Sequence, residues 1–115
     1  MSYDLAVWEG IRAASDDEGS GDYEYMMTTF HEADDPALPT PAIRNFVDAL
    51  LQRWPESDDR ACPWTQIPVI EQATGPLIYL TIRNKLSSEV SSWAAGLARE
   101  QGLVCFDPQW EALRP

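Results

Sequence analysis

Residues 40–55, with the sequence TPAIRNFVDALLQRWP, carry the pattern that most constrains the fold of this chain. Thr40 is a favourable N-cap, Pro41 suits the first helical position, and Pro55 cannot continue a helix. Between them, six apolar side chains recur at the three- and four-residue spacing that gives one continuous stripe on a helix. These are Ile43, Phe46, Val47, Leu50, Leu51 and Trp54. We therefore predict an amphipathic helix over residues 40–55.

Three other segments have the composition and periodicity of β-strands. Residues 2–9 and 77–84 alternate their side chains with a period of two, which indicates strands that are buried on one face. Residues 103–107 are a short apolar run that ends before a proline. A second helix is predicted over residues 87–102, because this segment begins with two serines that can cap it and ends at a glycine.

Residues 63–72 also resemble a strand, but Pro63 and Pro68 lack the N–H groups that a central strand donates to its neighbours. We therefore place this strand at the edge of a sheet. The resulting order is the ferredoxin-like split β-α-β pattern, an α+β fold with a four-stranded antiparallel sheet and two helices on one face. Its first and third strands are central. A chain of 115 residues fits one such domain over residues 1–115.

Residues 11–40 form an acidic insert after the first strand, rich in Gly and Ser at one end and Pro at the other. Only the segment YEYMMTTFHEA (23–33) is apolar enough for a short helix. The segment DDEGSGDYE (16–24) resembles a calcium loop, but Met27 stands where such a loop needs a bidentate Glu. The segment HEADD (31–35) offers one His and three carboxylates from a single stretch, whereas metal ligands normally converge from several. We predict no metal ligands and no cofactor.

The charge of the chain limits the kinds of partner that it can bind. Nineteen acidic residues against eight basic ones give a formal net charge of −11. Such a surface repels nucleic-acid phosphates and anionic headgroups, so we expect no nucleic-acid and no membrane partner, whereas a basic protein suits it. Acidity also serves solubility alone. The sequence contains no apolar run of membrane-spanning length, no signal-peptide pattern and only two cysteines, which predicts a cytoplasmic protein.

Cys105 is the strongest candidate for a nucleophile, because polar residues follow it in the segment VCFDPQ. A reactive thiol needs a base or a cation beside it, but the chain has one histidine, His31, which lies in the insert. Neighbouring carboxylates such as Asp107 raise the pKa of a thiol rather than lower it. We predict that Cys105 is packed and inert, and that Asp107 caps its own turn. The sequence therefore favours a protein that is not an enzyme.

The parity of the two central strands separates their side chains into two sets. One set faces the helices and consists of Leu5, Val7, Ile78, Leu80 and Ile82. The other set places Asp4, Trp8, Tyr79 and Arg83 on the face without helices. Trp and Tyr are large amphipathic side chains that are enriched at interfaces. We predict that these four residues form a binding surface, with Asp4 and Arg83 as a cross-strand pair at one end.

Three kinds of cover for this sheet face stay open. The insert can fold over it and pack Tyr23, Tyr25, Met26, Met27 and Phe30 on the sheet. A second copy of the chain can cover the face in a self-dimer, or another protein or a small ligand can bind there. A flat or convex face favours a protein partner, whereas a deep cleft under the insert favours a ligand.

Three stretches of the sequence resemble a group of short, acidic bacterial proteins: MSYDLAVWEG, WPE…PW…GPLIYLTI and GLVCFDPQWEALRP. The resemblance implies no activity, although some proteins of this type look like immunity or antitoxin proteins. With the negative charge and the absent catalytic residues, we expect a non-enzymatic, cytoplasmic protein-binding module that neutralises a basic partner. The alternative is a small-molecule-binding protein or a small enzyme that uses the open sheet face.

Overall fold

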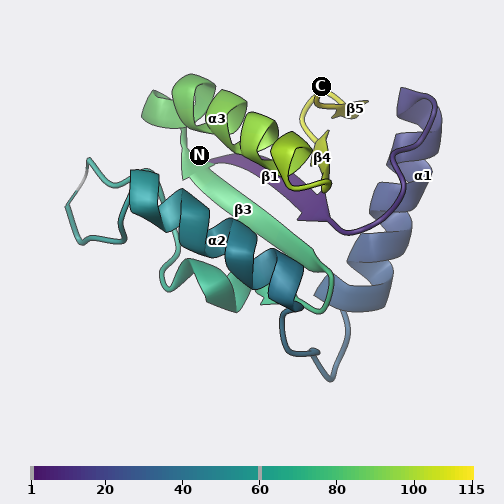
Figure 1. Ribbon diagram of the computed structural model, residues 1–115, viewed down its shortest axis with the longest axis horizontal. Helices are drawn as coiled ribbons and strands as arrows, with labels where there is room; N and C mark the ends of the chain where they lie inside the picture. Colours follow the sequence, from purple (N-terminus) through teal and green to yellow (C-terminus); the bar gives the residue numbers. More distant parts are fainter. Residues whose placement is uncertain (1, 60) are drawn as a thin grey trace.

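Figure 1 shows the computed structural model of the chain, which describes residues 2–59 and 61–115. In these residues five antiparallel strands form one sheet, in the order β2-β3-β1-β4-β5, and three α-helices pack on it. The strands are β1 (Ser2–Trp8), β2 (Ala73–Thr74), β3 (Leu77–Arg83), β4 (Val104–Asp107) and β5 (Ala112–Leu113). The helices are α1 (Asp16–Met26), α2 (Pro41–Arg53) and α3 (Ser87–Glu100). The chain is therefore α+β, as predicted.

The central pair of strands, β1 and β3, divides the core of the protein into two layers. Leu5 lies opposite Leu80 and Val7 opposite Ile78, and all four side chains pack beneath α2 and α3. On the other face Trp8 lies opposite Leu77, in a second cluster that α1 closes. The sheet is thus covered on both faces, by two helices on one side and by one helix on the other.

Helices α2 and α3 follow from local sequence signals. The Thr40 hydroxyl accepts a hydrogen bond of 3.3 Å from the Ile43 amide, which confirms the predicted N-cap of α2. Helix α3 ends as predicted, since Gly102 follows it with a φ of 73°. The predicted serine cap of α3 is wrong, because a 3-10 turn over Asn84–Leu86 leads into the helix and the Ser87 hydroxyl donates to the Asn84 carbonyl.

The predicted edge strand over residues 63–72 is wrong. Trp64 makes a single bridge to Ile82, and a 3-10 turn over Val69–Gln72 follows. The edge strand is instead the two-residue β2, which pairs with β3. Pro63 and Pro68 remove too many backbone donors for a ladder to form before Ala73. The predicted number of strands is also wrong, because β5 adds a fifth strand to the sheet.

Helix α1 lies in the acidic insert but begins seven residues before the helix expected there. Ser15 caps it by accepting a hydrogen bond of 3.2 Å from the Glu18 amide. The Glu18 carboxylate in turn accepts from the Ala14 amide, so two amides at the helix start are satisfied. A π-helical turn over Met27–His31 extends the helix. None of the helices in residues 2–59 and 61–115 is long and apolar enough to cross a membrane.

Candidate functional site

Helix α1 covers the sheet face on which the sequence predicted a binding surface. Trp8 is 2% exposed and packs with Phe106 at a ring-centroid distance of 6.1 Å. Tyr23 of α1 stacks on the same Phe106 ring at 4.9 Å. Trp8 therefore cannot contact a partner unless α1 moves away. The insert therefore covers this face of the sheet, which is the first of the three possibilities considered from the sequence.

Four of the five insert residues expected on this face do pack there: Tyr23, Met26, Met27 and Phe30. Tyr25 does not, because it is 64% exposed. The difference follows from helix geometry, since Tyr23 and Met26 lie three positions apart on one side of α1 and Tyr25 falls between them on the other. The insert thus buries a narrow apolar stripe and exposes the remainder of the helix.

The predicted cross-strand pair of Asp4 and Arg83 is wrong. In the observed register Asp4 lies opposite Thr81, and Arg83 lies opposite Ser2. The Arg83 Nε donates a hydrogen bond of 2.9 Å to the Cys62 carbonyl, which directs its side chain to another part of the chain. The Asp4 carboxylate instead accepts from the hydroxyl of Tyr79 at 2.7 Å. Arg83 is therefore not part of a patch with Asp4, Trp8 and Tyr79.

The two tyrosines between α1 and the sheet, Tyr23 of α1 and Tyr79 of β3, have raised pKa values. Burial raises the pKa of Tyr79, and the hydrogen bond to the Asp4 carboxylate raises it further. Burial also raises the pKa of Tyr23. Phenols with raised pKa values are poor general bases at neutral pH. This face therefore holds a packed layer with satisfied polar groups.

A buried carboxylate at the end of β4 connects both ends of the described chain. Asp107 is 1% exposed and accepts hydrogen bonds from the Tyr3 hydroxyl and from the amides of Gln109 and Trp110. Arg114 approaches the same carboxylate at 3.4 Å. The two turn amides confirm the predicted cap. The sequence did not indicate the bond from Tyr3, because 104 residues separate the two partners.

Cys105 lies two residues before Asp107 in β4 and is 3% exposed. Burial raises the pKa of its thiol to about 12. The packed position expected for Cys105 is thereby confirmed, and the raised pKa disfavours the reactive thiolate. Cys62 is also buried, and both cysteines are free thiols. No disulfide joins them, although two cysteines could in principle pair.

The insert segments that were considered as metal sites have other structures. Residues 16–24 belong to α1, so they form no loop that could wrap around a calcium ion. His31 is exposed and lies against the Tyr79 ring at 5.3 Å. In the part of the chain that the structure describes, no three His, Cys, Asp or Glu side chains are grouped so that they could hold a metal ion.

The insert carries most of the net charge of the chain on its outer side. Eight acidic residues lie in it against one arginine, so it supplies seven of the eleven net negative charges. We call the exposed carboxylates of this segment the acidic surface. It consists of Asp16, Asp17, Glu18, Asp22, Glu24, Glu32, Asp34 and Asp35. Among the described residues the ion pairs are Arg53–Glu89 and Arg114–Asp107, so none of these eight carboxylates is paired there.

Helix α1 displays part of this surface together with an exposed aromatic side chain. Gly19, Tyr23 and Met26 share the side that packs on the sheet. Asp17 and Glu24 are seven residues, or two turns, apart, so they share one side of the helix. That side is opposite to the packed one, because Asp17 lies about half a turn from Gly19. Tyr25 stands beside Glu24 and is exposed to solvent. The outer side of α1 thus combines unpaired carboxylates with a tyrosine, a residue type enriched at protein interfaces.

No protein-family model, no curated protein and no solved structure matches this chain.

Proposed function

We propose that this chain is a non-enzymatic protein that binds a basic protein partner through the acidic surface of α1 and residues 32–35. In this proposal it neutralises the partner as an immunity or antitoxin protein does. The observation that supports it most is the concentration of eight exposed carboxylates on one segment, none of which forms an ion pair within residues 2–59 and 61–115. Like charges that are held close together repel one another, and a basic partner relieves that repulsion while it is steered to the surface.

Two features favour a protein partner over a purely solubilising surface. The negative charge is concentrated in the insert rather than spread evenly over the chain. Exposed apolar anchors also lie close to it, since Tyr25 (64% exposed) and Ile11 (93% exposed) line the same hollow as Asp22. Tyrosine and apolar anchors supply the short-range contacts that charge steering alone lacks. A second copy of this chain is a poor occupant, because two acidic surfaces would face each other.

The non-enzymatic part of the proposal is supported by the residues first considered for chemistry. The pKa of Cys105 is raised by burial, and Trp8 lies beneath α1. The alternative of a ligand or substrate on the sheet face, bound by Asp4, Trp8, Tyr79 and Arg83, loses support for the same reason. The free thiols of Cys62 and Cys105 are consistent with a partner that is met in the cytoplasm.

We further propose that the sheet is a ferredoxin-like arrangement with two additions. The order β2-β3-β1-β4 and the packing of α2 and α3 on the same face support this. In this interpretation β2 is a shortened edge strand. Helix α1 and β5 are the additions, and they pack on each other where Gly19 meets Leu113. The proposed binding surface would then belong to an element added to the basic fold.

The test uses the full chain as bait in an extract of its source cell, with two variants of equal charge. One variant, Asp17→Asn/Asp22→Asn/Glu24→Gln, removes three charges from the acidic surface. The matched control, Asp48→Asn/Glu71→Gln/Glu100→Gln, removes three exposed charges from other parts of the chain. Bound proteins are quantified by mass spectrometry at low and high salt.

The expected result is one basic protein that the original chain and the control retain and the α1 variant loses. Its retention should fall as salt rises, because a largely electrostatic attraction is screened. Equal loss in both variants would mean that net charge alone governs binding, and a partner retained equally by all three proteins would place the interface elsewhere. Either outcome contradicts the proposal.

A further inference from the structure

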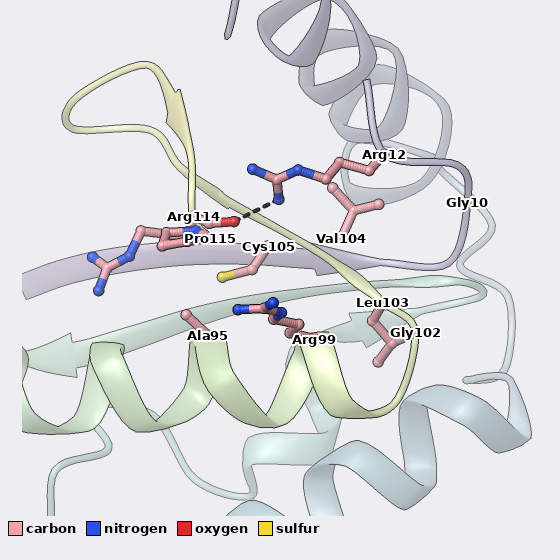
Figure 2. A pocket seen from close by; sticks show the side chains of 10 residues that line it. All are labelled: Gly10, Arg12, Ala95, Arg99, Gly102, Leu103, Val104, Cys105, Arg114 and Pro115. Carbon is pink, nitrogen blue, oxygen red and sulfur yellow. Dashed lines mark hydrogen bonds between the residues drawn. The ribbon is translucent and has the colours of Figure 1, made fainter. Parts of the chain in front are cut away.

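A cleft lined by arginines opens at the end of α3, and its lining includes none of the four residues predicted for binding (Figure 2). Its volume is about 490 Å³. Its walls come from three separate parts of the chain: residues 10–12 after β1, residues 95–105 around the turn from α3 into β4, and residues 114–115. The tertiary fold brings these parts together.

Three arginines line this cleft: Arg12, Arg99 and Arg114. They are three of the eight basic residues in a chain whose net charge is −11. In such a chain most basic side chains should find a carboxylate, because nineteen acidic residues are available. The fold therefore concentrates three positive charges in one cleft, although the composition of the chain is strongly acidic.

The hydrogen bonds of these arginines show which of them can still bind a ligand. The guanidinium of Arg114 is directed to Asp107 at 3.4 Å, so its charge is partly compensated. Arg12 donates to the backbone carbonyl of Arg114 at 2.6 Å, as Figure 2 shows, but has no carboxylate within ion-pair distance among the described residues. The side chain of Arg99 makes no hydrogen bond and no ion pair with any of the described residues. Two guanidinium groups thus lack a counter-charge.

The floor of the cleft is apolar. It is made by Ala95, Leu103 and Cys105, all of which belong to the buried cluster beneath α2 and α3. Burial raises the pKa of Cys105 to about 12, while the charges of Arg114 and Arg12 act in the opposite direction, so their positive field reaches this floor. A ligand that fits both parts of the cleft has an anionic group for the arginines and an apolar group for the floor.

We propose that this cleft binds an oxyanion attached to an apolar group, with Arg12 and Arg99 as the residues that hold the anion. Guanidinium groups donate two parallel hydrogen bonds to a carboxylate or a phosphate, and these charge-assisted bonds are the stronger kind. The site is independent of the proposed basic protein partner, because it has the opposite charge. It adds a second binding capacity to the chain, for a small amphiphilic anion.

The test is a titration of the full chain at low salt, followed by ¹H–¹⁵N NMR. Phenyl phosphate and phenylacetate are the two probes, because they share an apolar ring and differ in the oxyanion. Saturable shifts of the Gly10 and Gly102 amides and of the Arg99 side-chain Nε are expected with at least one probe. Saturation by phenyl phosphate alone identifies a phosphate site, and saturation by phenylacetate alone identifies a carboxylate site. The absence of saturation with both probes overturns the proposal.

Variants separate this site from general charge effects. Arg99→Gln removes a guanidinium that makes no hydrogen bond among the described residues, so the fold should be retained and the affinity should fall about tenfold or more. Arg12→Gln should weaken binding in the same direction. The matched control is Arg44→Gln, which removes one exposed positive charge from α2 and should leave the affinity unchanged. Equal weakening by Arg44→Gln and Arg99→Gln overturns the proposal, because it shows that only net charge matters.

Discussion

The Tyr79 hydroxyl donates a hydrogen bond of 2.7 Å to the Asp4 carboxylate on the sheet face that α1 covers. The two residues belong to neighbouring strands, β3 and β1, and lie two register positions apart along the ladder, since Asp4 is opposite Thr81 and Tyr79 is opposite Ala6. The carboxylate also accepts a hydrogen bond of 2.8 Å from the Ser2 hydroxyl. The Asp4 carboxylate thus binds Tyr79 and Ser2 rather than Arg83, its predicted partner. It makes the pair a structural contact between the two central strands.

Tyr79→Phe should reduce the free energy of unfolding by about 1 kcal/mol, the usual net value of a hydrogen bond that is lost while the ring stays packed. Urea unfolding followed by tryptophan fluorescence measures this change. The matched control is Tyr25→Phe, because Tyr25 is exposed and its hydroxyl has no hydrogen-bond partner among the described residues. An unfolding midpoint that moves equally in both variants would show that the bond to Asp4 contributes nothing.

The stability of the protein should decline as the pH rises above about 10, the ordinary pKa of tyrosine in an unfolded chain. The pKa values of Tyr3, Tyr23 and Tyr79 are all raised in the folded protein, chiefly by burial. Above pH 10 the unfolded chain therefore loses phenolic protons that the folded chain keeps, which favours unfolding. Below this pH the contribution is fully present.

Urea midpoints measured between pH 8 and pH 11 test this dependence. Tyr79→Phe should show a shallower decline than the original chain, because one of the three tyrosines no longer titrates. A midpoint that stays constant up to pH 11 would contradict the raised pKa values.

Two glycines of α1 should respond in opposite ways to the same substitution. A Cβ added at Gly19 would lie 2.9 Å from the Cγ of Leu113, which is closer than real side chains approach. Gly19→Ala should therefore destabilise the protein by about 1 to 3 kcal/mol, because α1 must move away from β5. A Cβ at Gly21 meets nothing within 4 Å, so Gly21→Ala should stabilise the helix by about 0.5 to 1 kcal/mol.

Thermal unfolding of the two alanine variants measures this difference. It also tests whether α1 packs on the sheet. If α1 were detached in solution, both alanines would stabilise it equally, since neither would meet a neighbour.

The parts of the fold that could be predicted are those fixed by local sequence signals. Helix α2 was predicted because Thr40 and Pro41 mark its start and its apolar stripe is continuous. Helix α1 was misplaced because its first half contains Gly19 and Gly21, which disfavour a helix, and three acidic residues. Its close contact with β5 explains Gly19, and that contact is tertiary, so no local pattern could indicate it.

The same distinction applies to the candidate sites. The period of two in β1 and β3 correctly placed Trp8 and Tyr79 on the face opposite α2 and α3. Parity shows which face a side chain is on, but it does not show which residue the side chain contacts. The Arg83 side chain reaches the Cys62 carbonyl, and no local pattern indicates that acceptor. The arginine cleft had no sequence signal at all. Its basic residues are widely separated in the chain and follow no common spacing.

Asp107→Asn should be among the more destabilising single substitutions in this chain, at a cost of about 2 to 4 kcal/mol. The carboxylate of Asp107 is 1% exposed and accepts from the Tyr3 hydroxyl, the Gln109 side chain and two turn amides, beside the guanidinium of Arg114. An amide of the same shape keeps the volume but replaces one acceptor oxygen with a donor group. It also leaves Arg114 without a counter-charge.

Urea unfolding of Asp107→Asn against Asp35→Asn measures this cost with the charge change held equal. Asp35 is an exposed member of the acidic surface without an ion-pair partner among the described residues, so its variant should keep the original midpoint. Tyr3→Phe removes a single donor from the network and should fall between the two. If Asp107→Asn unfolds at the same urea concentration as Asp35→Asn, the network does not hold β1, β4 and β5 together, and the stability of this edge must come from the packing of α1 alone.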